Sequence, residues 1–298
     1  MRAARWFLAA ILGTLLLAAL VAYPAWQLAQ ALEPEWQFHK VVSRLWQLLL
    51  LAGLVLALRR LGLRSREAWG YALPRSRFLR QFGSGLALGL ASMLPMSLAM
   101  LAFGILRPEP GLGAAAVLDA LAAGAAIGLA VALVEETFFR GLMFGAVARE
   151  SGFAAALWFT ALLYSAVHFL GRTPIPADEI GWASGLTLLG SAFANFAQPA
   201  AIVDSFVTLV LVGLLLGCVR QRSGAIAAGI GLHMGWVWVI QSTGALTDAR
   251  ADSRWSFLVS DFDGYTGWLV GGWAALLLAI AWTCGWLGAP RAAHRQDS

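Results

Sequence analysis

Long apolar runs alternate with short polar segments along the whole chain. Their centres lie at Leu16, Leu50, Ala91, Val131, Leu162, Val210, Gly231 and Leu277. Each run is about 20 residues long, the length that an α-helix needs to cross a bilayer. The pattern therefore predicts an all-α fold, a polytopic membrane bundle of about eight transmembrane helices.

No stretch between the runs is long enough to predict a soluble domain. The run after Arg2 and Arg5 is too long for a cleaved signal peptide, so it counts as the first span. We expect one membrane domain with two parts. Residues 1–112 form an N-terminal region of three spans, and residues 113–298 form a catalytic core of five spans.

Composition agrees with a membrane protein, since 60% of the residues are hydrophobic and 12% are charged. Soluble domains carry roughly 25% charged residues, so one large soluble core is excluded. Cys218 and Cys284 both lie in apolar runs and are not spaced as a metal pair or a disulfide framework. The sequence predicts neither a metal nor another cofactor.

The positive charges are distributed unevenly between the two sides of the predicted bundle. About 14 arginines fall on one side, among them Arg2, Arg64, Arg291 and Arg295, and about five basic residues fall on the other. Because basic residues accumulate in cytoplasmic loops, both termini should be cytoplasmic. The net charge of +5 then reflects contact with anionic lipid rather than with nucleic acid. The Arg-, Ala- and Leu-rich composition suggests a bacterial inner membrane.

Charged residues also occur inside one apolar run, in the segment "VEETFFRG". Each charge at that depth costs about 2.5–3.5 kcal/mol on insertion scales, so a compensating interaction is expected. Arg140 follows Glu136 by four residues, which is the favourable spacing for an ion pair on one helix face. Glu135 points about 100° away from that face. We therefore expect a structural Glu136–Arg140 pair and a separate role for Glu135.

Two histidines lie at a depth similar to that of Glu135. Counted from the nearest predicted turn, Glu135 lies roughly 21 Å deep, His168 roughly 22 Å and His233 roughly 16 Å. Three ionisable groups from three helices can therefore share one buried site. A carboxylate and imidazoles suit general acid–base chemistry, with Glu135 as the candidate base.

Three motifs in this order resemble the CAAX protease and bacteriocin-processing (CPBP) family, which includes the type II CAAX prenyl proteases. "EETFFRG" fits E-E-x-x-x-R, "YSAVH" (Tyr164 to His168) fits aromatic-x-x-x-His, and "GLHMGW" (Gly231 to Trp236) is similar to the third motif. The resemblance covers about Leu118 to Gln241. It implies an intramembrane glutamic endopeptidase that needs no cofactor and cleaves a peptide or a membrane-anchored protein.

The resemblance also implies roles for individual residues. Glu135 would activate water, His168 would help to hold that water, and His233 would stabilise the oxyanion. The residues with supporting roles would be Glu136, Arg140, Tyr164 and Trp236.

The third motif departs from the family pattern at one position. An asparagine normally follows the histidine by four residues and helps to bind the developing negative charge, but this chain has Val237 there. Loss of one such donor typically lowers the rate by about 10²–10³-fold. The indole N–H of Trp236 and the amide of Gln241 are the alternative donors.

Three other functions are compatible with parts of the pattern. A zinc protease could use Glu135, His168 and His233 as ligands, although the chain has no H-E-x-x-H helix. A proton-coupled transporter would also place Glu and His near the midplane, although no inverted repeat is visible. A catalytically weak immunity or scaffold protein of the same fold would explain Val237.

Overall fold

The computed structural model describes residues 1–32, 36–60, 62, 65–171, 174–250 and 252–285. Arg64, Arg291 and Arg295 of the charge count lie outside the described residues. The described chain is mostly helical and has only two short strands, so the predicted all-α class is confirmed. Four of its helical stretches are long and apolar enough to cross a membrane, namely Arg2–Leu20, Arg75–Ala102, Ala114–His168 and Val203–Ser223. The number of about eight crossings stays a prediction.

The chain forms two compact units. Unit 1 contains Met1–Arg64 and Ala166–Ile202, and unit 2 contains Ser65–Ser165 and Val203–Ser298. The division at residue 112 stays a prediction. The candidate residues 135, 136, 140, 164, 233 and 236 fall in unit 2.

Unit 1 is built around helices α1 and α3. Its elements are α1 (Arg2–Leu20), α2 (Ala22–Leu32), α3 (Phe38–Arg60), η2 (Ala177–Glu179), α7 (Ser184–Ala192), η3 (Ala194–Ala197) and η4 (Pro199–Ala201). Helix α1 packs against α3 and α7. Gly185 lies so close to the Ala19 carbonyl that a Cβ atom would have no room. The buried residues Ala22, Phe38 and Leu188 form a small apolar cluster.

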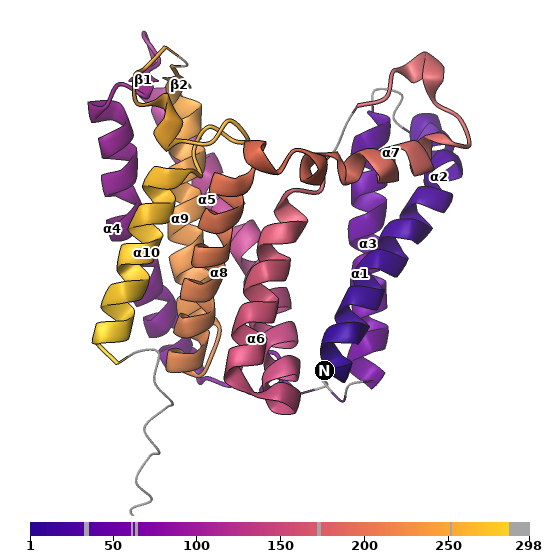
Figure 1. Ribbon diagram of the computed structural model, residues 1–298, viewed down its shortest axis with the longest axis horizontal. Coiled ribbons are helices and arrows are strands. Elements are labelled where there is room, and N and C mark those ends of the chain that lie inside the picture. The colour runs from indigo at the N-terminus through magenta and orange to yellow at the C-terminus, as the bar shows by residue number, and fades with distance from the viewer. Residues whose placement is uncertain (33–35, 61, 63–64, 172–173, 251, 286–298) are drawn as a thin grey trace, which may run out of the picture. The chain divides into compact units, whose positions relative to one another are not determined.

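Unit 2 is arranged around α9. Its elements are α4 (Arg75–Ala102), β1 (Leu106–Pro108), α5 (Ala114–Glu135), η1 (Glu136–Met143), α6 (Phe144–His168), α8 (Val203–Ser223), α9 (Ala227–Leu246), β2 (Thr247–Ala249), η5 (Ser256–Leu258) and α10 (Trp268–Thr283). Helix α9 contacts α4, α5 and α8 (Figure 1). Gly152 interrupts α6 with a φ of 84°, so the chain turns there between two helical segments.

Glycines allow α4 and α9 to touch along their backbones. A Cβ atom on Gly85 of α4 would collide with the Ala228 carbonyl oxygen, and one on Gly231 of α9 would collide with the Phe82 carbonyl oxygen. One turn further along, a Cβ atom on Gly235 would lie 2.9 Å from the Gly89 Cα. The two helices therefore make the close small-residue contact that is common between membrane helices.

Helix α5 approaches another face of α9 in the same way. A Cβ atom on Gly128 would lie 2.8 Å from the Met234 carbonyl oxygen and 3.1 Å from the Trp238 amide nitrogen. Helix α9 is therefore held between two backbones at close range. This packing leaves His233, between Gly231 and Gly235, little freedom to shift along the helix axis.

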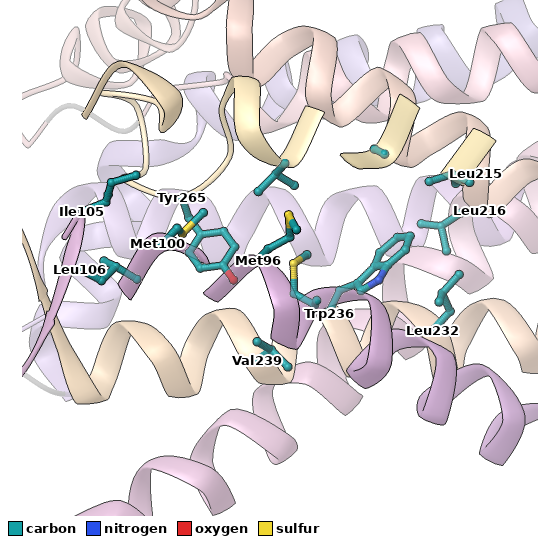
Figure 2. Close-up of a cluster of buried hydrophobic side chains, with 13 residues drawn as sticks. Met96, Met100, Ile105, Leu106, Leu215, Leu216, Leu232, Trp236, Val239 and Tyr265 are labelled. Atoms are coloured by element: carbon teal, nitrogen blue, oxygen red, sulfur yellow. The ribbon is translucent and has the colours of Figure 1, made fainter. Parts of the chain in front are cut away.

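An apolar cluster of unit 2 joins α4, α8, α9 and α10. Figure 2 shows Met96, Met100, Trp236 and Tyr265 among the side chains of this cluster. The Tyr265 hydroxyl pairs with the Ser97 hydroxyl at 2.6 Å, and burial raises the pKa of Tyr265 to about 12. Beside this cluster, β1 and β2 pair in an antiparallel ribbon, with Leu106 opposite Ala249.

The glycine contact predicts a sharp difference between two neighbouring substitutions in α4. Gly85→Ala should destabilise the protein by about 1–3 kcal/mol, because the new methyl group meets the backbone of α9. Gly83→Ala should be neutral or slightly stabilising, since nothing lies within 4 Å of its Cβ position. Thermal unfolding of both purified variants in the same detergent measures the difference. Equal melting temperatures would show that α4 and α9 separate more easily than the structure indicates.

Candidate active site

The two glutamates lie where α5 changes into a π-helix. Glu135 is the last residue of α5, and η1 (Glu136–Met143) is π-helical. Single π-helical turns inside α-helices are frequent at functional sites. The Phe144 amide donates to the carbonyls of Gly141 and Phe139, and the Arg140 carbonyl accepts a hydrogen bond from Arg220 Nε at 3.1 Å. Arg220 thus binds a backbone carbonyl within the π-helical segment η1.

Glu136 forms the centre of a buried polar array with Arg140 and His233. Arg140 Nη1 donates to Glu136 Oε1 at 3.1 Å, so the predicted ion pair is present. His233 Nδ1 lies 3.0 Å from the same oxygen. Glu136 and Arg140 are completely buried, and His233 is 4% exposed. A carboxylate in such surroundings requires both partners, because an unpaired buried charge costs several kcal/mol.

The hydrogen bond to Glu136 orients the His233 ring. An ionised carboxylate only accepts hydrogen bonds, so His233 Nδ1 carries the hydrogen. The other ring nitrogen, Nε2, lies 3.9 Å from Glu135 Oε2. This separation is too long for a direct hydrogen bond and suits two groups that bind one common water molecule. His233 therefore lies between two carboxylates with different surroundings.

Tyr164 of α6 joins Glu135 to the array. Its side chain is hydrogen-bonded with Glu135. The Arg140 guanidinium lies over the Tyr164 ring, 4.4 Å from the ring centroid, which is a cation–π geometry. The ring also contacts His233 edge to face, with centroids 6.3 Å apart. Tyr164 thus belongs to the same side-chain group as both glutamates.

Gly229 provides the space that Glu136 occupies. It lies one turn before His233 on α9, and a Cβ atom there would be 2.9 Å from Glu136 Oε2. Any larger residue would displace the carboxylate. Within the described part of the chain, Glu136 Oε2 and Arg140 Nε are buried and have no hydrogen-bond partner.

The structure directs Trp236 away from the array. Its indole N–H donates to the Ser92 hydroxyl at 2.8 Å, and its ring lies in the apolar cluster of Figure 2. Gln241 is exposed, and Val237 is partly buried. The Trp236 N–H is therefore bound to Ser92 rather than directed to Glu135 and His233.

His168 is the last residue of α6 and is counted with unit 1. It follows Tyr164 by four residues, which is the spacing of neighbours on one helix face. Its membership of the site stays a prediction. Over the described ranges, no three His, Cys, Asp or Glu side chains are grouped to hold a metal ion.

Several residues that support the array were not foreseen. The Tyr71 hydroxyl bonds to the Thr137 hydroxyl at 2.7 Å, and the Trp69 carbonyl covers Gly141 so closely that a Cβ atom would clash. In the sequence, nothing distinguishes Arg220 from the other arginines that are predicted to be cytoplasmic. No spacing rule predicts these contacts, because they join segments far apart in the chain.

A comparison with protein families identifies the segment that carries the array. Residues 117–239 match the family model described as "Type II CAAX prenyl endopeptidase Rce1-like". Over this segment the chain is similar to the Rce1-like family. The resemblance predicted from the three motifs is thereby confirmed. No curated protein and no solved structure matches the chain.

The Rce1-like segment begins in α5 and ends in α9, so it includes both glutamates, Arg140, Tyr164 and His233. The family is a protease family, and the apolar helices make this chain an integral membrane protein. At the level of the family, the match supports a CAAX-type membrane protease, that is, a hydrolase that acts on a peptide or a protein.

The array predicts that its two charged members control folding. Arg140→Ala or Glu136→Gln should destabilise the protein by about 3–5 kcal/mol and lower the yield of folded material, since each change leaves a buried polar partner uncompensated. Arg149→Ala, which removes an exposed arginine from the same helical stretch, serves as the control. Size-exclusion profiles and melting temperatures of the purified variants measure the effect. A normal yield and melting temperature for Arg140→Ala would contradict it.

Proposed function

We propose that this chain is an intramembrane glutamic endopeptidase in which Glu135 activates water for attack on a peptide bond. The observation that carries the proposal is the 3.9 Å separation between Glu135 Oε2 and His233 Nε2 beside a buried ion pair. A water molecule bound by both atoms would be held within reach of a general base. The family match supports the same reaction class.

The proposed reaction uses the two carboxylates differently. Glu135 takes a proton from the water as its oxygen bonds to the carbonyl carbon. The C–N bond then breaks, and the proton passes from Glu135 to the leaving nitrogen. Glu136 stays ionised and balances a positive charge on the His233 ring, whose Nε2–H donates to the oxyanion. Glu136 and Arg140 thus position the imidazole and do not touch the substrate.

Tyr164 and His168 complete the proposed site on the next helix. The hydrogen bond from Tyr164 fixes the direction of the Glu135 carboxylate. His168, one helical turn later, would help to hold the water, as the family motif implies. We propose no metal or other cofactor for this chemistry.

The substrate class follows from the position of the site within an apolar helical bundle. A peptide or a membrane-anchored protein would enter from the bilayer or its surface. We further propose a bacterial inner membrane location with both termini in the cytoplasm. The excess of arginines on one side of the bundle supports this orientation.

The proposal predicts that the two neighbouring glutamates respond differently to the same substitution. Glu135→Gln keeps the shape of the side chain and removes the base, so proteolysis should fall by about 10²–10⁴-fold while the amount of folded protein stays normal. Glu109→Gln, at an exposed position, should change neither. Proteomics of membrane and secreted fractions identifies termini that depend on Glu135, and the purified protein is then assayed on that substrate. Full proteolysis by Glu135→Gln would refute its role as the base.

Val237 favours a second candidate function, a catalytically weak immunity or scaffold protein. Since the Trp236 N–H is bound to Ser92, Val237→Asn should supply a missing donor and raise turnover by up to about 10²-fold. KM should change little, because the gain arises in the transition state. Loss of turnover in a folded Val237→Asn protein would show that another donor already completes the site. Absence of turnover in both proteins would favour the scaffold function.

A further inference from the structure

A groove with one polar end and one apolar end lies between three helices of unit 2. Its volume is about 200 Å³. The residues that line it come from α4, from the end of α8 and from the start of α9, and are Gln81, Ser84, Gly85, Leu88, Val219, Arg222, Ser223, Ala228 and Leu232. None of them is a member of the polar array, so the groove is a separate feature.

The polar end contains a hydrogen-bond acceptor that lacks a donor. Gln81 Nε2 donates to the Ser223 carbonyl at 3.3 Å, which fixes the side chain across the gap between α4 and α8. The other amide atom, Gln81 Oε1, is buried and accepts no hydrogen bond from the described residues. A buried acceptor in this state lacks the hydrogen bond that it would make to water in the unfolded chain. A ligand with a hydroxyl group would relieve that cost.

The same end carries a cation available to a ligand. Arg222 lines the groove and is exposed, and no carboxylate within the described ranges pairs with it. Arg220, two residues earlier, instead bonds to the Arg140 carbonyl. The exposed residues Arg75 and Arg77 at the start of α4 add positive charge near this end of the bundle. The groove is therefore complementary to an anion.

The other end suits a hydrocarbon chain. Leu88 is 56% exposed, and Val219 and Leu232 also line the groove. From Gln81 to Leu88 the helix rises about 10 Å, enough for a polar headgroup followed by the first methylene groups of an acyl chain. Basic pockets between membrane helices are typical sites for anionic lipid headgroups.

We propose that this groove binds a phospholipid whose headgroup is anionic and bears a hydroxyl group. The phosphate pairs with Arg222, the hydroxyl donates to Gln81 Oε1, and the acyl chain lies along Leu88 and Val219. A choline headgroup offers neither net negative charge nor a donor for Gln81. Selectivity for phosphatidylglycerol over phosphatidylcholine follows from these two contacts, independently of any proteolytic activity.

Native mass spectrometry of the purified full chain, titrated with each lipid, tests the proposal. Phosphatidylglycerol should bind more tightly than phosphatidylcholine, and Arg222→Gln should weaken it by about 10- to 100-fold, as expected for a charge-assisted hydrogen bond. Gln81→Leu should weaken it as well and reduce the preference over phosphatidylcholine. Arg77→Gln removes the same charge from outside the groove and should change the affinity by less than about twofold.

Three outcomes would overturn the proposal. Equal losses for Arg222→Gln and Arg77→Gln would indicate general charge attraction. Equal affinity for the two lipids would show that the headgroup does not make the proposed contacts with Arg222 and Gln81. Free glycerol 3-phosphate that competes as well as the lipid would indicate a site for a soluble anion. Melting temperatures of the variants distinguish lost binding from lost folding.

Discussion

A fully buried carboxylate, that of Glu136, determines how the core of unit 2 is built. Arg140 and His233 approach the same Glu136 oxygen at 3.1 and 3.0 Å, from η1 and from α9. Ionised groups in apolar surroundings are stable only with such partners. Gly229 is required because its missing side chain is the space that the carboxylate fills. Because the buried charge of Glu136 needs both partners, it links η1 and α9, which lie about 100 residues apart in the chain.

The glycine contacts of α9 serve the same arrangement. Helices α4 and α5 hold α9 by backbone contact at Gly85 and Gly128, so the height of His233 is set to within a small displacement. Hydrogen bonds across a membrane bundle contribute modestly, about 0.6 kcal/mol on average. Close packing therefore supplies much of the precision with which the imidazole is placed. The groove between α4, α8 and α9 borders this contact, because Gly85 and Ala228 also line it.

Sequence alone predicted the helical membrane fold and the Glu136–Arg140 pair, because each depends on local spacing along a helix. It did not predict the second partner of Glu136. The bond to His233 requires knowing which helices are neighbours, and hydrophobic runs without a strong amphipathic stripe do not specify that. Trp236 was assigned near the chemistry from its motif, whereas its N–H bonds to Ser92 on α4. The placement of His168 with Glu135 rests on depth and helical spacing alone.

The π-helical turn makes this segment sensitive to length as well as to composition. A π-turn contains one residue more than the α-helical turn that it replaces. The side chains of α5 and α6 therefore do not follow one continuous helical repeat, although each helix directs its own side chains correctly to its packing partners. Deleting a single residue between Glu136 and Met143 would restore a regular helix and rotate one side of the segment by about 100° relative to the other. The glycines of α5 would then leave α9, or Arg140 would leave Glu136. Related chains should therefore vary in residue type here more freely than in residue number.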